Sequence, residues 1–278
     1  MAAEASPLVS WAQLVGQHAL ALFFVGLLLA VGASGLGCVL LQRRRARRDQ
    51  DDPSARNVGR LLGGYATGFL LIVGTASLFA VIARRLGPGR TMGLADQALA
   101  DGIGSHTPAA ALRAFGLFTH LGDPIVLAVL GAVVALWLWQ RQARLLAAGW
   151  VIALGGNALL NPLLKQVFAR ARPLHELQVP QIEGYSFPSG HSSGALVAYG
   201  MLLYVATRLL PLRWHAVAVM AAVGLVLTIA CSRVFLRVHF ASDVAAGLLS
   251  GLSWLAVCVA SLQFVRHRHA NQPRGPRR

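Results

Sequence analysis

The sequence predicts an all-α protein, a polytopic transmembrane helical bundle. Hydrophobic residues make up 56% of the 278 residues and charged residues only 13%, which is too apolar for a soluble domain of this length. The apolar residues gather in seven runs near or above the roughly 20 residues that a helix needs to cross a membrane. Backbone polar groups in lipid must be hydrogen-bonded internally, so we expect these runs to be helices.

The seven runs are separated by polar connections. Glu4 is the only charge ahead of the first run, which lacks the basic flank of a secretory signal, so we expect a retained helix. The third run is the shortest, and its helix is expected to begin before Pro124. Trp137, Trp139 and Trp214 lie near run ends, as an interfacial aromatic belt predicts. The predicted spans are Ala19–Leu41, Leu61–Ala83, Pro124–Trp139, Leu145–Leu164, Ser192–Leu210, His215–Cys231 and Val244–Val265.

The formal net charge of +15 comes largely from arginines in alternate connections. Of the 25 basic residues, 16 fall in the first, third and fifth connections and the C-terminal tail, which seven spans place on one side. This positive-inside pattern predicts an extracytoplasmic N-terminus and a cytoplasmic C-terminus. Nucleic-acid binding explains the charge less well, because no aromatic residue interleaves with the run Arg43–Arg48 as a stacking surface requires. We expect that run to contact anionic lipid.

The chain divides into two parts. Residues 1–60 are predicted to be an appended transmembrane helix with an Arg-rich cytoplasmic linker, and residues 61–278 a compact membrane unit. Cys38, Cys231 and Cys258 lie within or at the ends of predicted spans, and none lies in a loop with a partner. The sequence therefore predicts no disulfide and no metal site.

The longest outer connection, residues 84–115, is expected to hold a short helix lying on the membrane interface. The apolar and acidic residues that suggest this helix are Leu94, Leu99, Ile103, Asp96 and Asp101. Asp123 is expected only to cap a helix, and Asn157 and Asn161 to form helix–helix hydrogen bonds. The polar residues expected to be solvated in outer loops are His120, His175, Glu176 and Glu183, of which His175 and Glu176 leave a headgroup contact open.

Three short motifs lie at ends of the apolar runs, and the first contains the only lysine of the chain. Lys165 ends the fourth run at the outer face, and Arg172-Pro173 follows it seven residues later. The alternative is that span-end cations reach for lipid headgroups, and this alternative suffices for Arg170. Since Arg is the usual cation of this chain, a lone Lys indicates a position that needs a compact ammonium.

The second motif, Pro188-Ser189-Gly190-His191, opens the fifth run. Proline and serine suit a helix start, where free backbone N–H groups attract anions. We expect the N–H groups of Ser189 and Gly190 to point toward an anion, with Gly190 allowing a phosphate to approach the backbone. A plain helix cap would explain Pro188 and Ser189 but not His191.

The third motif begins with Ser232-Arg233 at the end of the sixth run and continues to His239 and Asp243. The four-residue interval puts His239 and Asp243 on one face if the segment is helical. A carboxylate bonded to one ring nitrogen fixes the tautomer and leaves the other nitrogen free to attack. For this pair alone, a structural His–Asp hydrogen bond is an equally good interpretation.

The three motifs fall on three separate predicted helices but on the same predicted face of the membrane. Ionisable groups at such positions cost several kcal/mol (order of magnitude) unless they are paired or functional. Two histidines, one carboxylate and three cations are the groups needed to cleave a phosphate ester through a histidine nucleophile. We therefore predict a membrane-embedded phosphatase that uses no metal and no cofactor.

With these motifs the chain resembles the type 2 phosphatidic acid phosphatase family, or lipid phosphate phosphatases, whose active site is shared with vanadium haloperoxidases. The motifs of that family are Lys-(six residues)-Arg-Pro, Pro-Ser-Gly-His and Ser-Arg-(five residues)-His-(three residues)-Asp, and all occur here without a substitution. The resemblance covers residues 61–278. It implies a six-helix phosphatase core, which makes the first span one extra N-terminal helix.

The resemblance also implies a role for each motif residue. His239 would be the nucleophile that forms a phosphohistidine, with Asp243 orienting it. His191 would protonate the leaving group and then activate water. The phosphoryl oxygens would be held by Lys165, Arg172, Ser189, Gly190 and Arg233.

The expected reaction is hydrolysis of a lipid phosphate or diphosphate at the extracytoplasmic face of a bacterial cytoplasmic membrane. The bacterial source is inferred from the near-total use of Arg over Lys, which is typical of a GC-rich genome. Candidate substrates are undecaprenyl diphosphate, phosphatidylglycerol phosphate, phosphatidic acid and a lipid A phosphate. The segment of residues 174–187 between the first two motifs is too short for a headgroup-recognition domain, so the sequence does not distinguish among these lipids. A phosphotransferase with the same intermediate and a non-catalytic scaffold or transporter are the alternatives. The sequence makes no prediction of oligomeric state.

Overall fold

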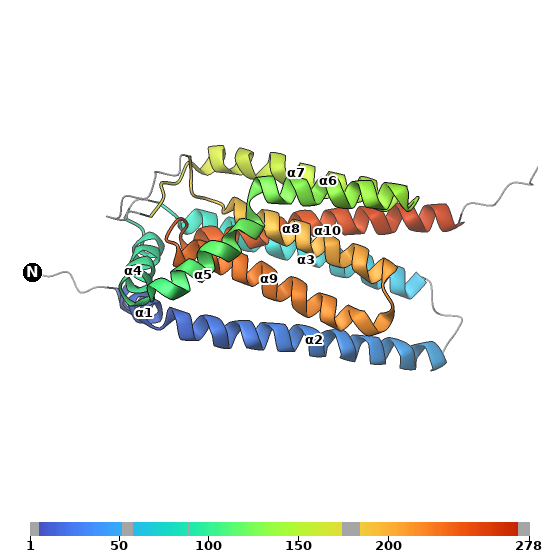
Figure 1. Cartoon of the computed structure of the whole chain (residues 1–278), viewed down its shortest axis with the longest axis horizontal. Coiled ribbons are helices and arrows are strands. Elements are labelled where there is room, and N and C mark those ends of the chain that lie inside the picture. Colours follow the sequence, from blue (N-terminus) through green and yellow to red (C-terminus); the bar gives the residue numbers. More distant parts are fainter. Residues whose placement is uncertain (1–5, 52–57, 88, 174–183, 272–278) are drawn as a thin grey trace, which may run out of the picture.

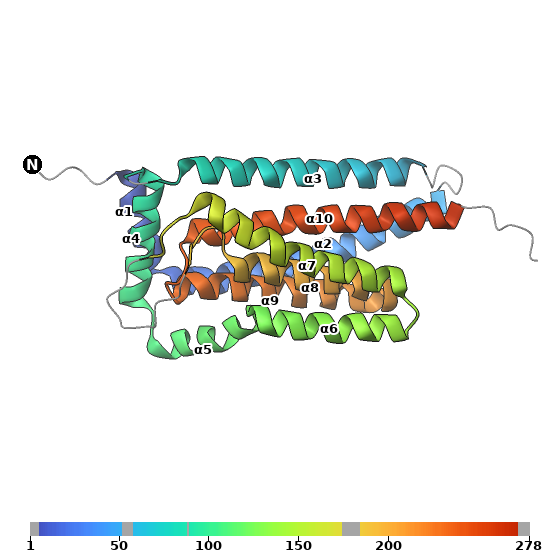
Figure 2. The ribbon, with the colours of Figure 1, turned by 90° about the horizontal axis from the view of Figure 1, so that it is seen from above.

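The computed structural model is a bundle of α-helices, and it describes residues 6–51, 58–87, 89–173 and 184–271. Long helices run side by side along one axis, and shorter helices cross one end (Figures 1 and 2). The α-helices are α1 (Pro7–Gln17), α2 (Ala19–Asp51), α3 (Val58–Arg85), α4 (Thr91–His106), α5 (Ala109–Thr119), α6 (Pro124–Gln140), α7 (Arg144–Phe168), α8 (Gly190–Leu209), α9 (His215–Phe235) and α10 (Ala241–Asn271). Two 3-10 turns, η1 (His120–Gly122) and η2 (Leu212–Trp214), precede α6 and α9.

The prediction of a polytopic helical bundle is confirmed, since each predicted span corresponds to one long helix. Among the described residues, α2, α3, α7, α9 with η2, and α10 are each long and apolar enough to cross a membrane. The helix of the third span, α6, begins at Pro124 and not before it as expected; α5 with η1 precedes it across a break, and the two pieces together form one candidate span bent by 46°. The remaining predicted span, α8, packs against α7, α9 and α10.

Helix α8 lies at the centre of the bundle, and small residues bring α10 against it. A Cβ atom added to Gly247 of α10 would lie 2.5 Å from the carbonyl oxygen of Ser189, and one added to Gly251 would lie 3.0 Å from that of Ser193. A pair of glycines spaced four apart is a common way for membrane helices to approach closely. This contact fixes the N-terminal ends of α8 and α10, which carry the second and third motifs, beside each other.

The N-terminal helices pack on the outside of this unit. Helix α2 runs along α9, and α1 packs against α4 at the end of the bundle (Figure 1). The packing is close, because a Cβ atom on Gly16 of α1 would lie 2.6 Å from the carbonyl oxygen of Leu99 and 3.0 Å from Cα of Gly102. The aromatic rings of Phe23 and Phe115 add an edge-on contact between α2 and α5, at 5.2 Å between centroids.

The helix expected within residues 84–115 is present as α4, which lies across the bundle end (Figure 2). Its amphipathic pattern is only partly as expected. Leu94 is exposed and Ile103 is buried, and Asp96, one of the two acids set against the apolar residues of this pattern, is only 7% exposed. Asp96 turns inward because it has a buried cation to pair with, Arg170.

The two ends of the bundle differ in what they carry. The connections that follow α7 and α9, which hold the motifs, lie at the same end as α1 and α4 (Figure 1). The connections with Arg141 and Arg213 lie at the opposite end. The side chains of Arg45, Arg47 and Arg48, and all residues after 271, lie outside the described part of the chain.

Candidate active site

Hydrogen bonds join the end of the first motif to the residues just before the second motif. The N–H of Ser186 donates to the carbonyl oxygen of Arg170 at 2.8 Å, and its hydroxyl donates to that of Ala171, also at 2.8 Å. Nε of Arg172 donates to the carbonyl oxygen of Gly184 at 3.2 Å. The segment after α7 is therefore held against the segment before α8, at the end of the bundle where α10 begins.

A cavity of about 710 Å³ opens between α6, α7 and α8. Its polar end is lined by six of the eight predicted site residues: Lys165, Arg172, Gly190, His191, Arg233 and His239. The other two, Ser189 and Asp243, are fully buried beside it. The structure thus brings all three motifs to one place.

His239 lies in the connection between α9 and α10 and is only 2% exposed. Its Nε2 is 3.4 Å from Nη1 of Arg172. A guanidinium can only donate, so Nε2 must be the unprotonated nitrogen and the ring proton must sit on Nδ1. Nδ1 lies 3.6 Å from Oδ2 of Asp243, just beyond hydrogen-bonding distance. Burial lowers the pKa of His239 to about 4, although Asp243 acts in the opposite direction, so the ring is neutral at pH 7.

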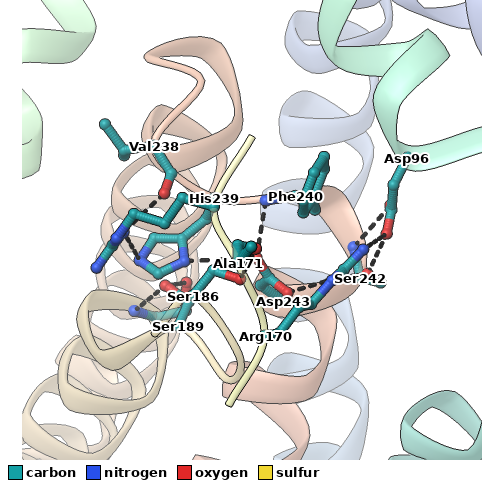
Figure 3. A network of polar contacts seen from close by, with 12 residues as sticks. Asp96, Arg170, Ala171, Ser186, Ser189, Val238, His239, Phe240, Ser242 and Asp243 are labelled. Carbon is teal, nitrogen blue, oxygen red and sulfur yellow. Dashed lines mark hydrogen bonds and ion pairs between the residues drawn. The ribbon is translucent and has the colours of Figure 1, made fainter. Parts of the chain in front are cut away.

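Asp243 is held from three sides (Figure 3). Its Oδ1 accepts from Nη1 of Arg170 at 2.6 Å, and its Oδ2 accepts from the N–H of Phe240 at 2.9 Å. Its carbonyl oxygen accepts from the N–H of Ser189 at 2.9 Å. Helix α10 begins at Ala241, so the predicted pairing of His239 with Asp243 is made by a loop and the first helical turn together.

The expectation for the backbone of the second motif is partly wrong. The N–H of Ser189 is used by the carbonyl oxygen of Asp243 and does not point toward an anion. The hydroxyl of Ser189 caps α8 by accepting from Ser192, as a cap residue should. Gly190 does line the cavity, and a Cβ atom there would lie 2.9 Å from Oδ1 of Asn161, so only glycine fits without a shift.

The cations of the cavity keep donors free for a ligand. Nη1 of Arg233 donates to the hydroxyl of Thr119 at 2.8 Å, while its Nε is buried without a hydrogen-bond partner in the described part of the chain. Nη1 of Arg172 donates to the carbonyl oxygen of Val238 at 2.8 Å, and burial lowers the pKa of this guanidinium. A buried donor without a partner is costly, and an anion in the cavity would satisfy it.

Asp123 is a site residue that the sequence did not reveal. Its Oδ1 lies 2.7 Å from Nε2 of His191, and its Oδ2 lies 2.7 Å from Nδ1 of His120. It precedes α6 but makes no side-chain capping hydrogen bond, so the prediction that it only caps a helix is wrong. The signal that could have found it is a carboxylate directly before an apolar run on the face that carries the motifs.

Arg170 was interpreted as a cation that reaches for lipid headgroups, and this is wrong as well. Its side chain is 14% exposed and forms ion pairs with Asp96 at 2.9 Å and with Asp243 at 2.6 Å. Asn161 behaves as expected, since its Nδ2 donates to the hydroxyl of Ser193 across α7 and α8 at 3.2 Å.

His175, Glu176 and Glu183 lie outside the described residues. Within the described residues, no three His, Cys, Asp or Glu side chains are grouped to hold a metal ion.

The chain matches known proteins through the part that holds the motifs. Residues 144–266, which span α7 to α10, match the model of the PAP2 superfamily. Phosphatidylglycerophosphatase B of Bacillus subtilis is 32% identical over 136 residues, which are 48% of this chain and 66% of that protein. Decaprenylphosphoryl-5-phosphoribose phosphatase of Mycobacterium tuberculosis is 34% identical over 157 residues, 55% of this chain and 78% of that protein.

A solved structure agrees with both. The crystal structure of a transmembrane PAP2 type phosphatidylglycerolphosphate phosphatase from Bacillus subtilis superposes with a TM-score of 0.60 at 25% identity, covering 74% of this chain and all of that one. Fold and relatives together define a multi-pass membrane phosphatase. The chain belongs to the PAP2 superfamily.

Proposed function

We propose that this protein hydrolyses the phosphate or diphosphate group of a membrane lipid through a phosphohistidine on His239. The observation that carries the proposal is the meeting of Nε2 of His239 with Arg172, Arg233 and Lys165 at the polar end of one cavity. The ring is neutral, and its unprotonated nitrogen is the one beside the cations. A phosphorus atom bound by those cations would lie next to a lone pair that can attack it.

The first half of the reaction transfers the phosphoryl group to the protein. Nε2 of His239 forms a bond to phosphorus while the bond from phosphorus to the leaving oxygen breaks. The imidazole becomes positively charged, and Asp243 stabilises that charge through Nδ1. Lys165, Arg172 and Arg233 hold the phosphoryl oxygens, with the backbone at Gly190, and neutralise the charge that spreads over them.

His191, paired with Asp123, transfers the protons of the reaction. His191 donates a proton to the departing lipid oxygen and then takes one from the water that attacks the phosphohistidine, after which the N–P bond breaks and phosphate leaves. Asp123 bonds one nitrogen of this ring, which fixes its orientation and supports the charged form. His191, whose role as proton donor and acceptor is implied by the family resemblance, thus has Asp123 as its carboxylate partner.

The apolar end of the cavity supports a lipid substrate. Below the cations its walls are small residues of α6 and α7, among them Ala128, Ala132, Gly155 and Ala158, all exposed on the outer surface of the bundle. Nε1 of Trp150 donates to the carbonyl oxygen of Gly131 at 2.8 Å and closes the inner side. A volume of about 710 Å³ is far more than one phosphate needs and leaves room for part of a lipid chain.

The orientation in the membrane follows from the charges. The motifs are at one end of the bundle, and the arginine-rich connections are at the other, which the positive-inside rule places in the cytoplasm. We therefore infer an active site on the extracytoplasmic face of the bacterial cytoplasmic membrane. Both curated relatives are named for lipid phosphate substrates, phosphatidylglycerophosphate and decaprenylphosphoryl-5-phosphoribose, and we place the substrate of this protein in the same class.

The test is phosphate release by purified protein in detergent with EDTA present. The panel contains phosphatidylglycerol phosphate, phosphatidic acid, undecaprenyl diphosphate and a decaprenyl phosphate derivative. We expect release that is lost in His239→Ala and kept in His215→Ala, whose histidine lies at the opposite end of the bundle. Protein quenched during turnover of a labelled lipid should carry an acid-labile, alkali-stable label. Release that survives His239→Ala would contradict the mechanism, and transfer of the label to an alcohol would identify a phosphotransferase.

A further inference from the structure

Arg170 lies between the phosphate-binding residues of the first motif in sequence, yet it does not line the cavity. Its Nη1 donates to Oδ1 of Asp243 at 2.6 Å and to the hydroxyl of Ser242 at 2.7 Å, and its Nη2 donates to Oδ2 of Asp96 at 2.9 Å. Its Cζ lies 4.2 Å from the ring centroid of Phe240 (Figure 3). Every one of these partners belongs to the protein, so Arg170 has a different task from Lys165 and Arg172.

Asp96 completes this network from a separate helix. It comes from α4, and its carboxylate accepts from Nη2 of Arg170, from the N–H of Ser242 at 3.2 Å and from the Ser242 hydroxyl. Ser242 directly precedes Asp243 in the first turn of α10. Asp96 therefore binds the Arg170 guanidinium, which pairs with Asp243, and the backbone N–H of Ser242 next to Asp243.

The position of α4 is itself fixed by contacts at two neighbouring residues. Gly102 packs against Gly16 of α1. Directly before it, Asp101 lies 3.4 Å from Nη2 of Arg237, which is in the same connection as His239. The N-terminal helices, which the sequence treats as an appendage, thus support the helix that delivers Asp96.

We propose that Arg170 and Asp96 are positioning residues that hold the carboxylate of Asp243 toward His239. This proposal rests on the proposed function, in which His239 is the nucleophile. Arg170 occupies Oδ1 of Asp243 and leaves Oδ2 on the side of the imidazole, where it lies 3.6 Å from Nδ1. Without Arg170 the carboxylate can turn about its terminal torsion, which is soft. The nucleophile would then lose the group that orients its ring and stabilises its charge.

This role predicts a change in turnover without a change in lipid binding. Neither Arg170 nor Asp96 touches the cavity, so the KM for lipid should stay within about twofold in Arg170→Met and Asp96→Asn. The kcat should fall about 10- to 100-fold, the size typical of groups that orient a catalytic side chain from behind. Arg170→Lys should recover part of the loss, because an ammonium can still pair with Asp243 but cannot bridge it to Asp96.

The pH dependence supplies a signature that a purely structural role would not produce. The charged groups facing His239 are Asp243 of α10, Arg172 after α7 and Arg233 of α9. Removing Arg170 leaves Asp243 without its paired cation, which favours the protonated ring. The acid limb of kcat/KM should move to higher pH in Arg170→Met and not in Asp96→Asn, where Arg170 still pairs with Asp243. The ionisation of the substrate cancels when variants and wild type are compared on one lipid.

The experiment measures kcat, KM and pH profile for these variants in detergent, together with thermal unfolding. Arg113→Met is the matched control for Arg170→Met, since it removes an exposed cation from α5. This control should keep the wild-type kcat within about twofold. If Arg170→Met does not fold, Ser242→Ala and Arg170→Lys carry the test.

The outcomes separate this proposal from the one it rests on. An active wild type with unchanged kcat in Arg170→Met and Asp96→Asn would overturn the positioning role and leave the phosphatase intact. A rise in KM equal to the fall in kcat/KM would also overturn it, because Arg170 would then be a substrate ligand. A wild type that releases no phosphate from any lipid would refute the proposed function, and the positioning role with it.

Discussion

Replacing Asp123 by Asn isolates the proton-transfer half of the mechanism. Oδ1 of Asp123 lies 2.7 Å from Nε2 of His191, and the Asp123 side chain is 33% exposed. Hydrogen bonds to a charged partner contribute about 1.5–3 kcal/mol and neutral ones about 0.5–1.5 kcal/mol. The difference is about 1–1.5 kcal/mol, and solvent screening at this partly exposed site places the value near its lower end. With about 1.4 kcal/mol for each tenfold in rate, Asp123→Asn should lower kcat/KM about five- to tenfold.

The assay compares two leaving groups. A lipid alcohol needs a proton as it departs, whereas 4-nitrophenolate leaves without one, and kcat/KM reports the steps up to that departure. The loss should therefore appear with the lipid phosphate and be absent with 4-nitrophenyl phosphate. His120→Ala is the control, because it removes the other hydrogen bond of Asp123 from a histidine that is 68% exposed, and it should cost less than about twofold. An equal loss on both substrates would refute the reasoning, since Asp123 would then act on binding or on His239.

Three other variants or conditions test the rest of the site. Burial lowers the pKa of His239 to about 4, so the ring gains a proton and loses its nucleophilic lone pair only as the pH falls through that value. The kcat/KM corrected for substrate ionisation should therefore keep its plateau down to about pH 5. A loss of kcat/KM already centred at about pH 6.5 would contradict a buried nucleophile. Ala158→Phe should fill the apolar end of the cavity and raise the KM for a lipid about tenfold, but not the KM for 4-nitrophenyl phosphate. Leu159→Phe, at an exposed residue of the same helix, should change neither KM. Equal effects of the two variants would exclude the apolar end of the cavity as the lipid site. Arg233→Lys keeps the positive charge but loses the forked N–H donors of the guanidinium and the hydrogen bond to Thr119. The kcat/KM should therefore fall at least about tenfold on both substrates. An unchanged kcat/KM would show that Arg233 does not bind the phosphate.

The spans and the motif residues could be predicted because each depends on local chemistry. A run of apolar residues must be helical in lipid wherever it lies, and a cation at its end must have a partner or a task. Lys165, His191 and His239 were therefore placed at one end of the bundle from hydropathy and loop charge alone. Their meeting in one cavity needs only that the three helix ends be neighbours, which the short connections favour.

The residues that the sequence did not reveal depend on contacts between distant segments. Asp96 and Arg170 are far apart in the chain, and they meet because α4, packed closely against α1 at Gly16 and Gly102, lies across the end of the bundle where α7 ends. Nothing in the local pattern of α4 distinguishes Asp96 from Asp101, which is exposed. Asp123 is similar, since a carboxylate before a helix is ordinarily a cap, and only the position of α8 brings His191 to it.

The division of charge explains why Asp96 and Asp243 matter to this phosphatase site. Four cations gather near His239, and a phosphate monoester supplies a charge of only about −1.5 to −2. Asp96 and Asp243 together neutralise Arg170, so its charge is committed to the protein and does not compete for substrate. Lys165, Arg172 and Arg233 remain for the phosphoryl oxygens. A single arginine bound between two carboxylates thus offsets one of their two negative charges, so the orienting carboxylate beside the nucleophile weakens the positive field that the substrate needs less than it would without Arg170.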